Sequence, residues 1–111
     1  MKRFFVVGHV DQNAILIKTT SRVEYYESRP ELLPGVVVCE AGEHPPFEHK
    51  TVIDPANAFA VPHANLERFR AAYTLDLLGC VPELRDRLAE AIRNNSRIER
   101  RRKIGLLACL G

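Results

Sequence analysis

Two apolar runs separated by a short polar group open the sequence. Residues 4–10 and residues 14–17 are rich in Phe, Val, Ile and Leu, and Asp11 to Asn13 stand between them. Apolar runs of this length, bounded by turn-forming residues, are typical of strands joined in a β-hairpin. Gly8, inside the first run, indicates a β-bulge or a close approach of another part of the backbone. The pattern therefore predicts an antiparallel hairpin.

The middle of the chain alternates short apolar runs with turn-forming residues. Residues 21–34 are mainly polar and end in a proline, which predicts a loop with one helical turn around Glu31. The segment "GEHPPFEH" holds two adjacent prolines, which exclude regular structure there. Three more short strands are expected, with a turn at Pro55-Ala56-Asn57 before the last of them. They cover residues 35–41, 50–54 and 58–62.

After Pro62 the apolar positions recur at helical spacing. The spacing predicts one helix over residues 63–79, ended by a glycine, and a second over residues 82–95. The second begins with Pro82, which suits the first turn of a helix. The segment "SRIE" has the form of a capping box, so we expect a last helix to begin at Ser96.

The order of these elements, strands followed by helices, predicts an α+β fold. A length of 111 residues suits one domain over residues 1–111, mainly β over 1–62 and mainly helical over 63–111. The composition, 46% hydrophobic and 27% charged, excludes a disordered chain. No apolar run approaches the roughly 20 residues of a membrane-spanning helix. We therefore expect a cytoplasmic protein with no membrane partner.

The sequence carries no strong pattern for metal or cofactor chemistry. Glycine-rich phosphate loops, paired CxxC motifs and zinc-protease motifs are absent from it. The three cysteines, at positions 39, 80 and 109, lie among apolar neighbours, which predicts buried thiols. His44 and His49 bracket "HPPFEH", where a solvated loop is favoured over a metal site. We expect no metal and no cofactor.

Cations and hydroxyls stand at the ends of the hairpin that are expected to meet. Arg3 precedes the first apolar run, and Thr19, Thr20, Ser21 and Arg22 follow the second. An antiparallel hairpin pairs Arg3 roughly with Thr20 or Ser21. A guanidinium beside hydroxyls can hold a phosphodiester, with the cation on the phosphoryl oxygens. Taken singly, each residue is explained by its strand or turn preference.

A second cationic group stands near the C-terminus. The net charge is only +2, but Lys and Arg are twice as numerous as Asp and Glu after Pro82. Most of the excess lies in "RIERRRK", residues 97–103. A local basic patch of this kind attracts phosphates, and a solvated helix face is the alternative. As candidate nucleic-acid contacts the segment supplies Arg97, Arg100, Arg101, Arg102 and Lys103.

Together these patterns resemble the PemK/MazF family of toxin endoribonucleases. The resemblance is carried by an arginine directly before an apolar strand in "KRFFVV", by "AILIKTTS", by "KTVIDPANAFAVP" and by "LLGCVPELRDRLAEAI". It covers most of the chain as an order of elements. At the level of residues it rests on Arg3 and on the hydroxyl cluster Thr19, Thr20 and Ser21.

The resemblance implies an SH3-like small barrel. The order of strands before helices, with short turns, itself predicts a strongly bent antiparallel sheet followed by C-terminal helices. It also implies a toxin of a toxin–antitoxin system that cleaves single-stranded RNA without a metal, by attack of the 2′-hydroxyl. The partners it implies are RNA, an antitoxin protein and a second copy of the chain.

Such a cleavage step needs a base, an acid and a cation for the developing charge. By the resemblance, Arg3 is the cation, and Thr20 and Ser21 position the phosphate. His49 is the candidate acid or base, with other choices at His9 and Glu48. Thr19 and Arg22 would contact RNA together with the basic C-terminal segment.

A non-catalytic module is the alternative function. The resembled family usually places a further strand and a Gly-rich loop before the arginine, and this sequence shows no counterpart of them. The module would bind nucleic acid through the basic C-terminal helix, or a protein through the apolar tail, residues 104–110. Because this tail has no polar face, we expect it to dock on its own domain or on a second copy, and we expect a homodimer.

Overall fold

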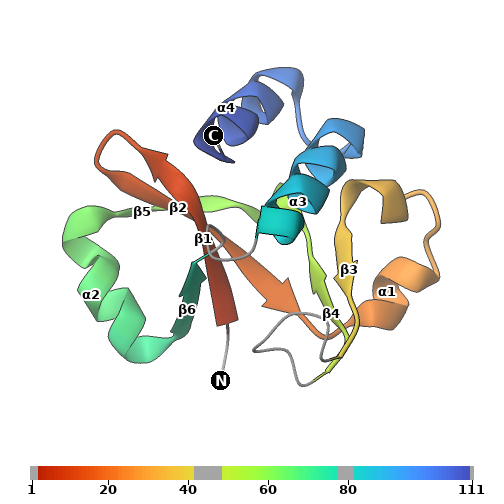
Figure 1. Ribbon diagram of the computed structural model, residues 1–111, viewed down its shortest axis with the longest axis horizontal. Coiled ribbons are helices and arrows are strands. Elements are labelled where there is room, and N and C mark those ends of the chain that lie inside the picture. Colours follow the sequence, from red (N-terminus) through yellow and green to blue (C-terminus); the bar gives the residue numbers. More distant parts are fainter. Residues whose placement is uncertain (1–2, 42–48, 78–81, 111) are drawn as a thin grey trace.

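The computed structural model describes residues 3–41, 49–77 and 82–110 (Figure 1). Six strands, four α-helices and two 3₁₀ turns lie in these ranges. In order they are β1 (Arg3–Val10), β2 (Asn13–Thr20), α1 (Val23–Glu27), η1 (Leu33–Gly35), β3 (Val37–Cys39), β4 (Thr51–Ile53), η2 (Pro55–Asn57), β5 (Phe59–Pro62), α2 (His63–Ala72), β6 (Thr74–Leu77), α3 (Pro82–Asn94) and α4 (Arg100–Leu110).

The strands form one sheet in the order β3-β4-β2-β1-β6, and β5 also pairs with β2. Every pair is antiparallel except β1 with β6, which is parallel. Along one edge, β2 pairs with β5 over Asn13 to Leu16 and with β4 over Thr19 and Thr20. The predicted α+β fold, an antiparallel sheet with C-terminal helices, is thereby confirmed. The described strands do not close into a barrel.

The predicted hairpin is confirmed, and its bulge lies where the sequence indicated. The register of β1 against β2 shifts between Val6 and Gly8. Gly8 also lies against the end of α4, because a Cβ added there would stand 2.3 Å from the carbonyl oxygen of Cys109. Glycine is required at this position by the close approach of two backbones.

The helix predicted over residues 63–79 is wrong in its second half. Helix α2 ends at Ala72, and the chain continues in extended conformation from Tyr73 into β6. Thr74 to Leu77 alternate polar and apolar residues, and they pair with the free edge of β1. Pairing there also satisfies the edge groups of β1, which one more helical turn would leave unpaired. The described part of residues 63–111 therefore holds one strand, β6, besides its three helices.

Two shorter predictions are also corrected. The helical turn expected around Glu31 lies earlier, in α1, and η1 follows that position. The last helix begins at Arg100 instead of Ser96. The reason is that the side chain of Asn95 accepts a hydrogen bond from the Arg97 amide at 2.9 Å, which makes a tight turn where the capping box was expected.

The sheet is covered on both faces. On one face, Phe5, Ile17 and Ile53 pack with α3 and α4, including the buried Leu106 and Leu110. On the other face, a smaller cluster joins the second set of β1 and β2 side chains to α2; it contains Phe4, Val6, Ala14, Leu16 and Val61. Figure 1 shows α3 and α4 together on one side of the sheet and α2 beside β5 and β6.

The helical tail is docked within its own chain. Leu106 and Leu110 are buried, whereas Ile104 is 61% exposed. Cys39 is buried and Cys109 is half-buried, while Cys80 lies outside the described residues. None of the described helices has the length and apolar character needed to cross a bilayer.

Candidate nucleic-acid interface

A polar hollow opens where the end of β2 meets α1, η2 and the segment before α4. Its volume is about 620 Å³. It is lined by Phe4, Lys18, Thr19, Thr20, Arg22, Tyr25, Tyr26, Asn57, Phe59 and Arg97. We call it the phosphate hollow, after the nucleic-acid contacts that the sequence predicts for four of its residues: Thr19, Thr20, Arg22 and Arg97.

The two threonines of the hollow are held by local hydrogen bonds. Thr19 donates from its hydroxyl to the carbonyl of Arg3 at 3.3 Å. Thr20 accepts a hydrogen bond from the Arg22 amide at 3.1 Å, which starts the turn into α1. A hydroxyl has one proton and two acceptor positions. The Thr20 hydroxyl, used here as an acceptor, can therefore still donate its proton to a phosphate oxygen.

The bulge at Gly8 changes the partner that was predicted for Arg3. An unbroken hairpin would set Arg3 beside Thr20, but the shift between Val6 and Gly8 moves the neighbour by one residue, to Thr19. A shift of one residue also turns a strand's side chains to the opposite face. Arg3 is half-buried and does not line the phosphate hollow.

Two other predicted catalytic residues, Ser21 and His49, also lie away from the hollow. Ser21 is exposed, and its carbonyl accepts a hydrogen bond from the Val23 amide. His49 is exposed, with its carbonyl bonded by the Thr51 hydroxyl, and Glu48 lies outside the described residues. Neither Ser21 nor His49 lines the hollow. Of the predicted catalytic residues, only Thr20 does.

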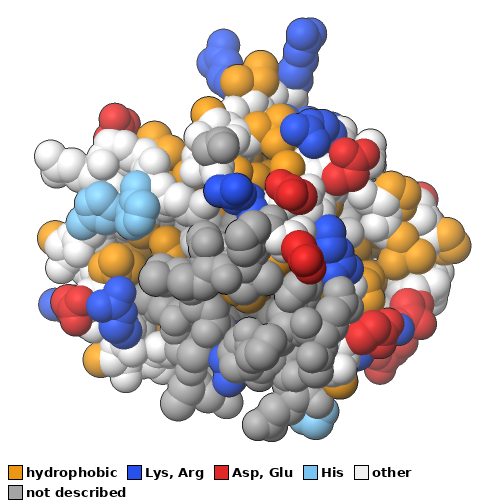
Figure 2. Space-filling model, viewed as in Figure 1, with side chains coloured by type: hydrophobic (Ala, Val, Ile, Leu, Met, Phe, Trp, Pro, Cys, Tyr) orange, Lys and Arg blue, Asp and Glu red, His pale blue; other side chains and the backbone are white. Residues whose placement is uncertain are grey.

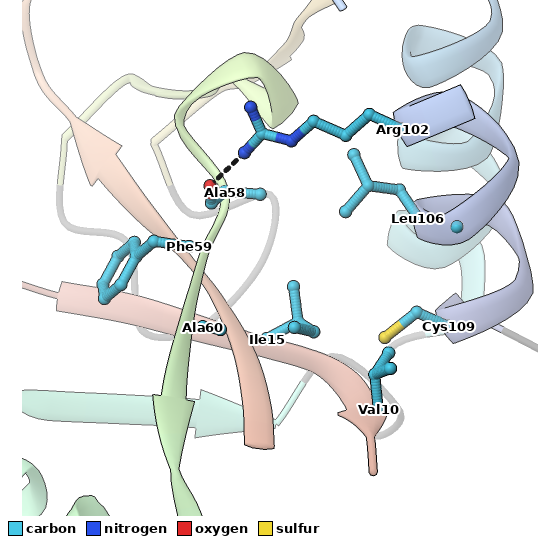
Figure 3. Close-up of a pocket in the computed structure, with 9 residues that line it drawn as sticks. Val10, Ile15, Ala58, Phe59, Ala60, Arg102, Leu106 and Cys109 are labelled. Atoms are coloured by element: carbon cyan, nitrogen blue, oxygen red, sulfur yellow. Dashed lines mark hydrogen bonds between the residues drawn. The ribbon is translucent and has the colours of Figure 1, made fainter. Parts of the chain in front are cut away.

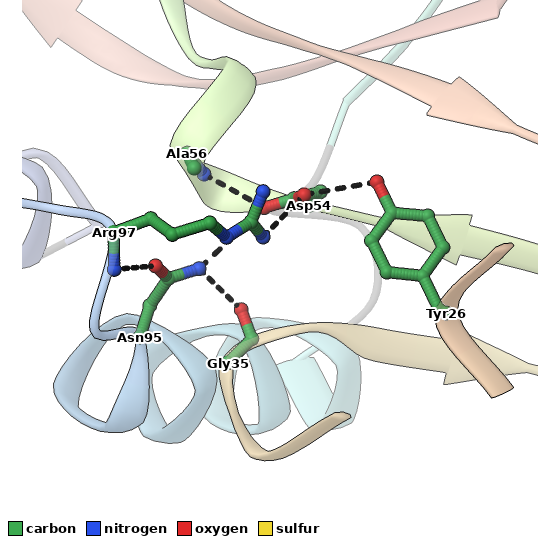
Figure 4. A network of polar contacts seen from close by, with 6 residues as sticks. All are labelled: Tyr26, Gly35, Asp54, Ala56, Asn95 and Arg97. Carbon is green, nitrogen blue, oxygen red and sulfur yellow. Dashed lines mark hydrogen bonds and ion pairs between the residues drawn. The ribbon is translucent and has the colours of Figure 1, made fainter. Parts of the chain in front are cut away.

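A buried carboxylate, Asp54, bonds two of the residues that line the hollow, Tyr26 and Arg97 (Figure 4). Asp54 is completely buried and accepts hydrogen bonds from the Tyr26 hydroxyl at 2.9 Å and the Ala56 amide at 3.0 Å. Arg97 pairs with the same carboxylate at 2.5 Å. Asn95, also buried, contacts Asp54 at 3.5 Å and donates to the carbonyl of Gly35 at 2.8 Å.

The network holds Tyr26 in its protonated form. Burial, followed by the hydrogen bond to Asp54, raises the pKa of the Tyr26 hydroxyl to about 12. Arg97 has two tasks, since it neutralises Asp54 and also lines the hollow. Arg97 stands out in the sequence as part of the basic segment, but its partner does not, because Asp54 is separated from it by 43 residues and no local pattern marks it.

Two exposed aromatic rings stand at the hollow and were also missed. Tyr25 is 47% exposed and Phe59 is 37% exposed. The guanidinium of Arg29 lies 4.0 Å from the Tyr25 ring centroid, and Phe59 packs edge-on against Phe4 at 5.7 Å. The adjacent tyrosines shortly after Arg22, Tyr25 and Tyr26, are the signal that could have located the first of them.

The basic C-terminal segment divides into two groups. Arg102 donates to the carbonyl of Ala58, and Lys103 donates to the carbonyl of Arg93 at the end of α3, at 2.9 Å. Arg100 and Arg101 are exposed, and the described residues offer them no ion pair. Figure 2 shows Lys and Arg side chains projecting from the surface over α4. Part of the predicted nucleic-acid contact is thus committed to the fold.

A second hollow, of about 280 Å³, is mainly apolar and lies between α4 and the strands β1, β2 and β5 (Figure 3). Val10, Ile15 and Leu106 point into it, and Arg102 closes one end by its bond to Ala58. In the described part of the chain, no three His, Cys, Asp or Glu residues lie close enough to hold a metal ion.

Comparisons with protein-family models, with curated proteins and with solved structures found no match to this chain. Function has therefore to be argued from the residues and their geometry.

Proposed function

We propose that this chain binds the backbone of single-stranded RNA in the phosphate hollow. The observation that carries the proposal is the convergence of three cations on one hollow: Lys18 and Arg22 at the end of β2, and Arg97 from a segment far away in the sequence. A cleft lined by cations focuses its potential on a phosphate. Thr20 adds a hydroxyl proton beside them, as argued above from its bond to the Arg22 amide.

The aromatic rings favour unpaired bases. Single-stranded nucleic acids bind where a cationic groove follows the backbone and exposed rings stack on the bases. Tyr25 and Phe59 offer such rings at the same hollow as Lys18 and Arg22. Each base that stacks on such a ring contributes about 1–3 kcal/mol, largely without regard to sequence.

Metal-independent cleavage of the bound RNA is the second part of the proposal, and it rests on the resemblance to the PemK/MazF toxins. The hollow supplies cations that can stabilise the charge developing on phosphorus. A base for the 2′-hydroxyl is also required, and His49, the sequence candidate, does not line the hollow. Binding is therefore the function that this geometry supports best.

The resemblance extends to the fold, the location and the partners of the chain. A strand whose one edge pairs first with β5 and then with β4, as β2 does, is compatible with the strongly bent sheet of an SH3-like barrel. We propose this relationship, together with a cytoplasmic location, a homodimer and an antitoxin partner. A non-catalytic binding module is the alternative that the same measurements test.

The test compares two pairs of substitutions that remove the same charge. Lys18→Ala with Arg22→Ala empties the hollow of two cations, whereas Arg100→Ala with Arg101→Ala removes two from α4. Binding to a labelled single-stranded RNA is measured over a range of salt concentrations. We expect the first pair to reduce the salt slope by about 1.4, since each phosphate contact contributes about 0.7.

If the Arg100/Arg101 variant loses more RNA affinity than the Lys18/Arg22 variant, binding belongs to the basic helix α4. If the wild type and both variants bind RNA equally, the hollow is not the binding site. Cleavage is followed separately on the same RNA in the presence of EDTA. RNA that stays intact while binding is salt-dependent identifies the non-catalytic module. RNA that is cut by the wild type, and not by the Lys18/Arg22 variant, supports the toxin-like nuclease.

A further inference from the structure

Two histidines from different elements meet on the surface, away from the phosphate hollow. His9 lies on β1 near the hairpin turn, and His63 is the first residue of α2. The Nδ1 atom of His9 is 2.9 Å from the Nε2 atom of His63, and the ring centroids are 5.0 Å apart. Figure 2 shows histidine side chains gathered on this face over the hairpin and the start of α2.

The backbones that carry these rings are fixed by hydrogen bonds to the same hairpin. His9 is paired with Ala14 in the ladder between β1 and β2. The amide of His63 donates to the carbonyl of Gln12, within the hairpin turn, at 2.8 Å. The two backbones therefore hold the rings within reach of one another, and the contact between the rings sets how they face.

We propose that His9 and His63 form a binding site for a divalent transition-metal ion of the nickel or copper type. The ligands are Nδ1 of His9 and Nε2 of His63. With metal–nitrogen distances near 2.05 Å, two ligands at a right angle stand about 2.9 Å apart, whereas a tetrahedral angle separates them by about 3.3 Å. The observed separation of 2.9 Å matches the right angle, which square-planar and octahedral ions prefer.

The same separation also fits a hydrogen bond between the rings when no metal is bound. In that state one nitrogen carries a proton and donates it to the lone pair of the other. Metal binding needs both facing nitrogens unprotonated, so the shared proton moves to the far nitrogen of its own ring. Each imidazole stays neutral in this change, and the rings are exposed, so that water can reach the far nitrogens and fill the other metal positions.

The site is independent of the proposed RNA-binding function. Neither histidine lines the phosphate hollow. No third His, Cys, Asp or Glu joins the pair among the residues that the structure describes, so the site has two protein ligands. A bound ion would link β1 directly to the start of α2 and would stabilise the folded chain by mass action.

The experiment titrates Ni²⁺ into the protein free of any histidine tag and follows binding by calorimetry. We expect one ion per chain, bound through both histidines. Mutating a residue that only hydrogen-bonds to a metal ligand costs about 10–100-fold in metal affinity. Removing a ligand itself should cost at least as much, so we expect His9→Ala and His63→Ala each to weaken Ni²⁺ binding at least tenfold. His49→Ala is the matched control, because it removes an exposed histidine elsewhere and should leave the affinity unchanged.

A second measurement keeps the test decisive. Ni²⁺ should raise the unfolding temperature of the wild type and of the His49 variant, and should leave those of the His9 and His63 variants unaltered. Circular dichroism confirms that each variant is folded, and His63→Gln replaces His63→Ala if the latter is not. Equal Ni²⁺ affinity in the wild type and in the His9 and His63 variants would show that the pair is only a hydrogen bond, and would overturn the proposal.

Discussion

Arg97 forms an ion pair with Asp54 at 2.5 Å, in which the carboxylate is buried and the guanidinium is about one-third exposed. The pair joins the segment before α4 to the start of η2. Tyr26 of α1 bonds the same carboxylate, so three parts of the chain meet at one buried charge. A buried carboxylate is stable only while its partners are in place. The wall of the phosphate hollow therefore depends on Asp54.

We predict that Asp54→Ala strongly destabilises the fold. Removing one member of a buried pair costs about 3–5 kcal/mol, because the other members lose their partner. Arg97 can turn toward water, which places the expected loss in the free energy of unfolding near 3 kcal/mol. Urea denaturation measures it.

The matched control for Asp54 is Glu67→Gln on α2. Glu67 pairs with Arg70 at 2.9 Å, but both side chains are more than half exposed. Exposed pairs of this kind contribute about 0–1 kcal/mol. If the two variants lose similar stability, the Asp54 network is not a structural centre of the domain.

Tyr26 predicts a specific loss of stability in alkali. Its pKa is raised from 10.0 to about 12 in the folded chain, first by burial and then by its hydrogen bond to Asp54. Between these values the folded state binds more protons than the unfolded state, so stability falls as the pH rises. The stability that depends on protonated Tyr26 is fully present below pH 10. A pKa shift of two units corresponds to a loss of about 2–3 kcal/mol in the free energy of unfolding once Tyr26 is ionised.

The measurement compares the wild type with Tyr26→Phe in urea at several pH values. At neutral pH the wild type should be more stable by about 1 kcal/mol, from the hydrogen bond that phenylalanine lacks. Between pH 10 and 12 this advantage should shrink and reverse. A constant difference across that range would mean that Tyr26 ionises at its ordinary value.

Local patterns explain which elements could be predicted from the sequence. The hairpin, the short strands before Pro62 and the helix beginning at Pro82 depend on residues close to one another. Strand β6 could not be found in this way. Its place beside β1 depends on an open edge more than sixty residues earlier in the chain. Tertiary pairing of this kind overrides helical spacing.

The residues of the candidate site also divide into those that local sequence marks and those that only the fold brings together. Thr19, Thr20 and Arg22 lie within one stretch of four residues, so the sequence could mark them as a cluster, and they do line the hollow. The assignment of Arg3 failed by one residue because the bulge at Gly8 changed the register. Asp54 and Phe59 gain their roles only from the fold, which brings η2 and β5 to the end of β2.

Two glycines, Gly8 on β1 and Gly105 on α4, predict opposite effects of alanine. At Gly8 an added Cβ would meet the carbonyl oxygen and Sγ of Cys109, both at 2.3 Å, so α4 would have to move off β1. Overpacking of this kind costs about 1–3 kcal/mol. At Gly105, inside α4, an added Cβ meets nothing within 4 Å.

Gly105→Ala should therefore stabilise the chain by about 0.5–1 kcal/mol through helix propensity, while Gly8→Ala destabilises it. Thermal unfolding of the two variants beside the wild type gives both signs in one experiment. A neutral result at Gly8 would indicate that the end of α4 is not tightly docked on the hairpin.

The proposed homodimer makes its own prediction at Ile104. This residue is 61% exposed on α4, whereas Leu106 and Leu110 of the same helix are buried in their own domain. Ile104 is thus the large apolar side chain of the tail that the fold leaves for a partner. Burying it contributes up to about 1.5–3 kcal/mol per copy, so a dimer formed through α4 should be sensitive to this position.

Sedimentation velocity at micromolar concentration measures the mass. We expect a dimer for the wild type and a monomer for Ile104→Glu, with Ala71→Glu on the exposed side of α2 as the charge-matched control. A wild-type monomer, or a dimer that tolerates glutamate at position 104, would exclude α4 as the dimer interface.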